Sequence, residues 1–152
     1  MKTSTWVITI GVIAVLVLLF AWPKFNSPYK ADIDRITKSG LDCSPMEGTA
    51  QHFHPVLRIF VDGVEETIPA NIGIFPGCMS EIHTHDMVGT IHVESPSLKK
   101  AFYIKDFFVV RGAPIERDGY TVGMTVDGQP NIEMGNLLLR DKQQIELIYT
   151  HK

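Results

Sequence analysis

Residues 52–68 read HFHPVLRIFVDGVEETI, and this stretch decides the class of fold that the sequence predicts. Apolar side chains occupy every second position from Phe53 to Val61, with histidine, valine, arginine and phenylalanine between them. A period of two indicates a β-strand, so we expect the first set to face a core. Asp62-Gly63 then predicts a tight hairpin turn, with a return strand through residues 64–68.

The chain beyond this hairpin carries the same kind of signal. Further strands are expected at 81–85, 90–95, 120–126 and 144–150, with turns at 86–89 and Asp127-Gly128, a loop at 71–77 and one helical turn at 105–110. Ile145, Leu147 and Tyr149 share one face of the last strand. Several short strands separated by Asp-Gly turns indicate a mainly β domain, either an antiparallel β-sandwich or a small barrel.

The N-terminus predicts a membrane anchor. The stretch from Trp6 to Trp22 has no charged residue, and its length is close to the lower limit of about 17 residues for a spanning helix. A cleaved secretory signal is the alternative, but the apolar core of a signal is usually about 7–15 residues long and no small-x-small cleavage site follows here. We therefore expect one transmembrane helix in the cell membrane, with the C-terminal domain outside the cytoplasm, in the periplasm or at the cell exterior.

Three segments follow from these signals. Residues 1–23 form the anchor or signal, residues 24–42 form a linker and a short helix at 32–39 that Gly40 ends, and residues 43–152 form a histidine-rich β domain. The charges are 14 Lys+Arg against 17 Asp+Glu, a formal net charge of −3, and the basic residues are not clustered. No nucleic-acid partner is therefore expected, because phosphate binding needs clustered lysine and arginine.

Cys43 and Cys78 are the two cysteines of the chain. In an oxidising compartment an even pair is most simply a disulfide. The competing interpretation makes Cys78 a thiolate metal ligand, because Met79 and His83 follow it closely.

Five of the six histidines lie between positions 52 and 92, as the pairs His52-Phe-His54 and His83-Thr-His85 and as His92. Residues i and i+2 of a strand project from the same face, so each pair can direct two imidazoles toward one ion. If residues 86–89 form a four-residue loop, His83 lies opposite His92, His85 opposite Thr90, and Glu81 opposite Glu94. Opposed residues have Cβ atoms about 4.5–5.5 Å apart, close enough to share a metal.

This pattern predicts a transition-metal site. The expected ligands are His83, His85, His92, His52, His54 and Glu94, and the residues expected to orient them from behind are Asp86 and Glu81. Imidazole suits copper and zinc, and the nearby thioethers of Met79 and Met87, which are also plausible packing residues, favour Cu(I). We expect copper before zinc, and metal delivery, storage or sensing as the role. His151 is expected to be an ordinary surface residue.

Two other functions stay open at this point. The first is a structural or accessory subunit of a membrane protein complex, whose histidines make protein contacts, a hydrogen-bonded network or a pH-sensitive surface. The second is a small metalloenzyme, in which His92-Val-Glu94 joins His83 or His85 as a two-histidine, one-carboxylate iron site. The chain has no Gly-x-Ser-x-Gly and no His-Glu-x-x-His motif, so catalysis is the less favoured hypothesis.

Residues 83–96 read HTHDMVGTIHVESP, and IPANIGI at 68–74, HFH at 52–54 and KDFF at 105–108 accompany them. This combination resembles an uncharacterised family of small prokaryotic domains that are membrane-anchored and extracytoplasmic. The resemblance covers about residues 50–112. It implies a location and a histidine-rich site, and it implies no reaction.

Overall fold

The computed structural model describes residue 6, residues 8–17 and residues 27–152, and the chain separates into two compact units, Met1–Ala31 and Asp32–Lys152. In the first unit, residues 8–17 are helical. Within the described part of the chain, no helix has both the length and the apolar character that crossing a membrane requires. Much of the predicted anchor and linker, residues 1–5, 7 and 18–26, lies outside the described residues, and the anchor therefore stays a prediction.

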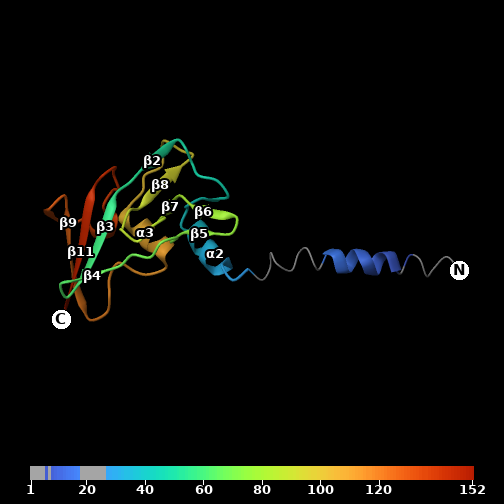
Figure 1. Cartoon of the computed structure of the whole chain (residues 1–152), viewed down its shortest axis with the longest axis horizontal. Coiled ribbons are helices and arrows are strands. Elements are labelled where there is room, and N and C mark those ends of the chain that lie inside the picture. Colours follow the sequence, from blue (N-terminus) through green and yellow to red (C-terminus); the bar gives the residue numbers. More distant parts are fainter. Residues whose placement is uncertain (1–5, 7, 18–26) are drawn as a thin grey trace. The chain divides into compact units, whose positions relative to one another are not determined.

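The chain from residue 30 onward is mainly β, as expected, with two short α-helices (Figure 1). The helical elements are α2 (Lys30–Lys38), α3 (Ile104–Arg111) and the 3₁₀ turn η1 (Met134–Asn136). The strands are β1 (Cys43–Ser44), β2 (Gln51–Phe53), β3 (Val56–Val61), β4 (Val64–Glu66), β5 (Ile74–Phe75), β6 (Cys78–Ser80), β7 (Ile82–His83), β8 (His92–Ser95), β9 (Tyr120–Val126), β10 (Gln129–Asn131) and β11 (Gln144–His151).

These strands form three sheets, in the orders β10-β9-β11-β3-β4, β2-β8-β7 and β1-β6-β5. The described residues contain no closed barrel, so the prediction of a small barrel is wrong. The expectation of antiparallel pairing also fails at one place, because β11 runs parallel to β3. A parallel pair requires a long crossover connection, and the chain between β3 and β11 supplies it. This connection includes α3 and the strands β5 to β8 of the two smaller sheets.

The predicted hairpin forms as expected. Val61 pairs with Val64 across a turn in which Asp62 and Gly63 both have positive φ, 49° and 82°. A two-residue turn of this kind matches the twist of the flanking strands. Leu57 and Ile59 of β3 are buried, together with the predicted apolar face of β11, and these side chains form part of one hydrophobic core.

The expected strand from Phe53 to Val61 is instead two strands, β2 and β3, which belong to different sheets. The break falls at His54-Pro55, where proline has no N–H group to donate to a ladder. The Pro55 carbonyl still accepts a hydrogen bond from the Ile91 N–H at 2.9 Å. Because of this break, β2 leaves the large sheet and pairs with β8.

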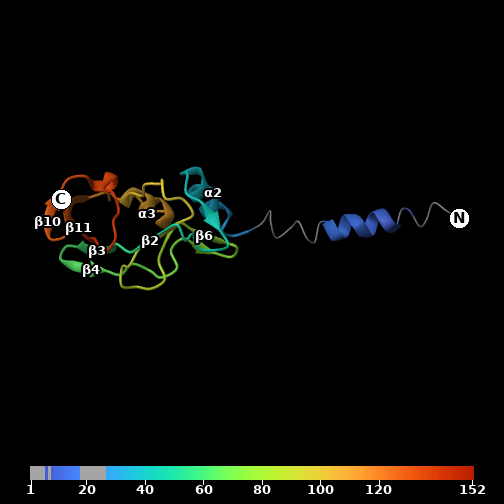
Figure 2. The same cartoon turned by 90° about the horizontal axis from the view of Figure 1, so that it is seen from above.

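The segment predicted as one helical turn is an eight-residue helix, α3. It begins where the Asp106 carboxylate accepts a hydrogen bond from the Tyr103 N–H at 2.8 Å, and it ends at Gly112, whose φ is 75°. Four of its eight side chains are buried, and Lys105 is exposed. Figures 1 and 2 both show α3 between the five-stranded sheet and the β1-β6-β5 sheet. The expected loop at 71–77 contains the short strand β5.

The two cysteines form a disulfide, with Cα atoms 4.9 Å apart. The bond joins β1 to β6, which also pair with each other as neighbouring strands. The interpretation of Cys78 as a thiolate ligand is therefore wrong. The disulfide forms because the pairing of β1 with β6 brings Cys43 within bonding distance of Cys78.

Glu66, at the end of β4, is held between two arginines. Arg117 donates to both carboxylate oxygens, at 2.6 and 3.0 Å, and Arg111 donates at 2.6 Å. The hydrogen bonds from Arg117 above all, with those from Arg111, lower the pKa of Glu66 to about 2. This carboxylate ties the hairpin to the end of α3 and to the loop that follows it.

Replacing Glu66 by glutamine is expected to lower the free energy of unfolding by about 1–2 kcal/mol at pH 7, after discounting for partial exposure of the pair. The folded-state pKa is lowered, so the stabilisation is complete above the unfolded value of about 4.3 and disappears as the pH falls toward 2. Urea unfolding of both proteins between pH 2 and pH 7 measures this. Glu65→Gln is the matched control, because Glu65 makes an exposed pair with Arg58, and an equal effect of the two substitutions would contradict the account.

Candidate metal centre

The small sheet β2-β8-β7 places the histidines on one face. Its central strand β8 carries His92 and Glu94, which point the same way because they are two residues apart. His52 of β2 lies opposite Glu94, and His83 of β7 lies opposite His92, as the sequence predicted for the second pair. The residues that alternate with them, Val93 above all, belong to the core.

His54 and His85 follow the ends of β2 and β7, and their rings turn toward His92. The ring centroids of His54 and His85 lie 4.6 Å and 4.5 Å from that of His92. Among the described residues, two groups have ligand atoms that all lie within 4.8 Å of one another: His52, His54, His92 and Glu94 form one, and His83, His85, His92 and Glu94 form the other. The five imidazoles thus gather on one face, in two groups that share His92 and Glu94.

The expected pairing of His85 with Thr90 is wrong. Thr90 instead forms a bridge with Val56 of the large sheet, and the Leu57 N–H donates to the Gly89 carbonyl at 2.9 Å. The chain at 86–90 thus leaves β7 and packs on β3. For this reason His85 does not pair with β8. Its exposed ring lies against that of His83, with the two ring centroids 4.7 Å apart.

His83 is fully buried and its ring is fixed in one orientation. Its Nδ1 donates a hydrogen bond to the Ser80 carbonyl at 2.9 Å, because a carbonyl can only accept. A neutral His83 therefore keeps its lone pair on Nε2, which faces Nε2 of His85 at 3.1 Å. Burial lowers the pKa of His83, so the ring is neutral at pH 7. A metal-binding histidine commonly has this second hydrogen bond to a carbonyl.

Glu94 lies between the histidines with a side chain only 3% exposed. Its Oε1 is 3.2 Å from Nε2 of His52 and 3.4 Å from Nδ1 of His92, and its Oε2 is 3.9 Å from Nε2 of His83. Glu94 Oε2 and His92 Nδ1 are buried and have no hydrogen-bond partner. Buried polar atoms without partners are rare, and metal bound among these ligands would account for both.

These separations also fit pairs of ligands that share a metal ion. Two ligands of a tetrahedral ion with bonds of about 2.0 Å are about 3.3 Å apart. The three contacts at 3.1, 3.2 and 3.4 Å bracket that value.

His92 completes the donor set from the central strand. Burial lowers its pKa, and the charges of His85 and His54 act in the same direction. The ring is therefore neutral at pH 7 and offers a lone pair. With a neutral His83 and a carboxylate beside them, the arrangement can hold a divalent cation in a partly buried position.

The two carboxylates expected to orient the histidines make other contacts. Glu81 accepts hydrogen bonds from the Ser95 hydroxyl at 2.6 Å and the Asp42 N–H at 2.8 Å, and it pairs with Lys100. Asp86 accepts from the Val88 N–H at 3.0 Å inside the exposed loop. Their expected role behind the ligands thus stays a prediction, and the contacts that the structure gives them favour a structural role.

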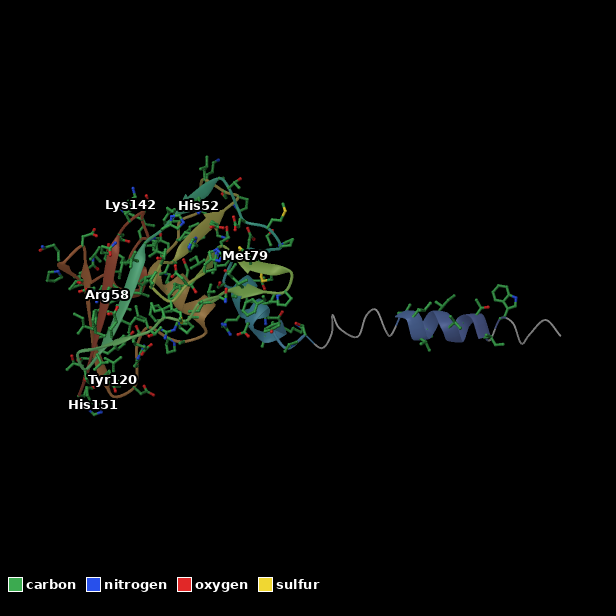
Figure 3. The ribbon with its side chains drawn as sticks, viewed as in Figure 1. His52, Arg58, Met79, Tyr120, Lys142 and His151 are labelled. Carbon is green, nitrogen blue, oxygen red and sulfur yellow. A yellow bond between two sulfur atoms is a disulfide. The ribbon has the colours of Figure 1, made fainter. Side chains whose placement is uncertain are left out.

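The methionines give limited support for a soft metal. Met87 is 65% exposed, on the loop before Gly89. Met79 is half-buried and lines a cavity that Glu81 and Glu94 also border. His151 lies at the opposite end of the domain from His52, as Figure 3 shows, and it is exposed as expected.

Sequence reasoning missed the Ser80 carbonyl, which orients His83. No side-chain pattern could have found it, because any residue at that position supplies the same carbonyl group. It also missed that the histidine face of the sheet is partly covered. Alternation of apolar and polar residues predicts that the polar face is exposed to solvent, but His83 and Glu94 are buried.

No family model matches the chain, and no curated protein and no solved structure is significantly similar to it. The resemblance to a family of membrane-anchored domains therefore stays a prediction. The case for a function depends on the geometry of the five histidines and Glu94.

Proposed function

We propose that this protein binds a transition-metal ion through the histidines and Glu94 of the β2-β8-β7 sheet, and that it does so outside the cytoplasm while anchored in the cell membrane. The observation that carries the metal proposal is the cluster itself: five imidazoles and one buried carboxylate face one another, with two buried polar atoms unpartnered. The uncharged run at 6–22 supports the anchor. The disulfide supports an oxidising compartment.

Copper is the metal that we favour, with zinc as the alternative. The cysteines are paired and offer no thiolate, so the donors are imidazole nitrogens and carboxylate oxygen. Such donors suit divalent ions, and Cu²⁺ binds a given set more tightly than Zn²⁺ does. This reasoning favours Cu²⁺ over Cu⁺, since Met87 is largely exposed.

Delivery, storage or sensing is the role that we propose for the bound ion. The His52 side chain is 51% exposed and the His85 ring is also open to solvent, so a ligand can leave the ion without unfolding the sheet. Exchange with a partner requires such access. His83, which is fully buried, would hold the ion during the exchange.

Metal analysis of protein produced without an affinity tag tests the proposal. After incubation with Cu²⁺ or Zn²⁺ and removal of free ions, we expect at least about one equivalent of metal per chain. The His83→Ala, His92→Ala double variant should retain background amounts only. His151→Ala is the matched control, because its ring lies away from the cluster, and it should retain the metal in full.

Two results would contradict the proposal. The first is a metal content of the unaltered protein no higher than that of the double variant. The second is equal loss in the double variant and in His151→Ala, which would indicate nonspecific binding. Either result would favour the accessory-subunit hypothesis, in which the histidines make protein contacts.

A further inference from the structure

We propose that the site holds two metal ions, and that the carboxylate of Glu94 bridges them. One ion would bind between His52 and His54, and the other between His83 and His85. This inference rests on the proposed function, because it concerns how many ions the same site takes and how they share its ligands.

The candidate ligands divide into two groups. The pair His52 and His54 and the pair His83 and His85 fall into different groups of mutually close ligand atoms. Two ligands on opposite sides of one ion are only about 4 Å apart, since each bond is about 2.0–2.1 Å long. The ligand atoms of each group lie within 4.8 Å of one another, so small side-chain movements would bring each group onto one ion. The six side chains together do not form a single group.

Glu94 belongs to both groups. Its Oε1 faces His52 at 3.2 Å, and its Oε2 is nearest to His83 at 3.9 Å. Each oxygen thus faces a different histidine pair. Oε2 is buried without a hydrogen-bond partner, so a single ion at Oε1 would leave it unsatisfied. A second ion removes this cost.

His92 lies midway between the pairs. Its ring centroid is 4.6 Å from that of His54 and 4.5 Å from that of His85. It is therefore able to complete either ligand set. Carboxylate-bridged pairs of ions about 3.5–4 Å apart are an established arrangement in proteins.

The two positions differ in depth. The His83 and His85 position includes a fully buried ring whose orientation the Ser80 carbonyl fixes. The His52 and His54 position includes a half-exposed ring and no buried histidine. A preorganised and sheltered site binds more tightly. We therefore expect the His83 and His85 position to fill first, and the ion at the His52 and His54 position to exchange more readily.

Titration of the metal-free full-length protein with Cu²⁺ alone, followed by native mass spectrometry and electron paramagnetic resonance, tests this. The unaltered protein should take up two ions in two steps. The second ion should couple magnetically to the first and produce a half-field signal. His52→Ala and His85→Ala are a matched pair, because both rings are exposed and each belongs to one group only. We expect each to weaken one binding step at least tenfold and to leave the other unchanged.

The outcomes separate this inference from the proposed function. Two coupled ions, with one step lost in each variant, would support both. A single ion whose affinity falls in both variants would overturn the inference and leave metal binding intact. Two uncoupled ions would overturn the bridging role of Glu94. No bound Cu²⁺ above that of the His83→Ala, His92→Ala variant would overturn both proposals.

Discussion

Replacing Glu94 by glutamine is expected to lower the affinity for metal at least 100-fold, which corresponds to about 2.8 kcal/mol of binding free energy. The substitution keeps the shape of the side chain but removes the charge that lies between the histidines. A neutral amide oxygen is a much weaker ligand for Cu²⁺ or Zn²⁺ than a carboxylate. Equilibrium competition with a chelator of known affinity measures the change.

The same substitution is expected to leave the metal-free protein as stable as before, or more stable by about 1 kcal/mol, because it removes a buried charge with an unpartnered oxygen. Urea unfolding in the presence of a chelator measures this. The combination of lost metal binding and retained stability is typical of a ligand. A loss of several kcal/mol in the metal-free protein would instead show that Glu94 is a structural partner of His52, as the accessory-subunit hypothesis requires.

Removing the Cys43–Cys78 disulfide is expected to lower the free energy of unfolding by about 4 kcal/mol, because the bond closes a long loop in the unfolded chain. The two cysteines are 35 positions apart. The bond also holds β1 against β6, which leads directly into β7 and His83. Unfolding in urea with and without reductant, and of the Cys43→Ser, Cys78→Ser variant, measures the loss.

The disulfide variant also tests which residues bind metal. Where the variant is folded, it should bind metal as the unaltered protein does, since the sulfur atoms are paired to each other and the candidate ligands are nitrogen and oxygen. Loss of metal from a variant that is still folded would contradict the assignment. A change in stability below about 1 kcal/mol would contradict the role of the loop closure.

The local parts of the fold were predictable, and the long-range parts were not. The hairpin at Asp62-Gly63 and the buried face of β11 follow from alternation and turn chemistry, which act between near neighbours in the chain. The parallel pairing of β11 with β3 joins strands that are distant in sequence, and no local pattern encodes it. The length of α3 was underestimated because residues 107–110 form an unbroken apolar run, which gives no clear helical period.

The candidate site was predictable where strand periodicity governs it. His83 lies opposite His92, and Glu94 lies on the same face as His92, because side chains alternate along β7 and β8. The positions of His54 and His85 depend instead on where the chain leaves the sheet. For His54, the chain leaves β2 just before Pro55. For His85, the contact of Gly89 with β3 draws residues 86–90 away from β7. The sequence alone therefore did not determine where these two rings point.

X-ray absorption of the metal-loaded protein at the edge of the bound metal tests the central claim most directly, because it reports the ligands of the ion. The account predicts nitrogen or oxygen ligands at about 2.0–2.1 Å and outer-shell scattering from at least two imidazole rings per ion. It also predicts that no sulfur shell near 2.3 Å is present. A first shell of sulfur, or a nitrogen and oxygen shell without the imidazole pattern, would contradict it.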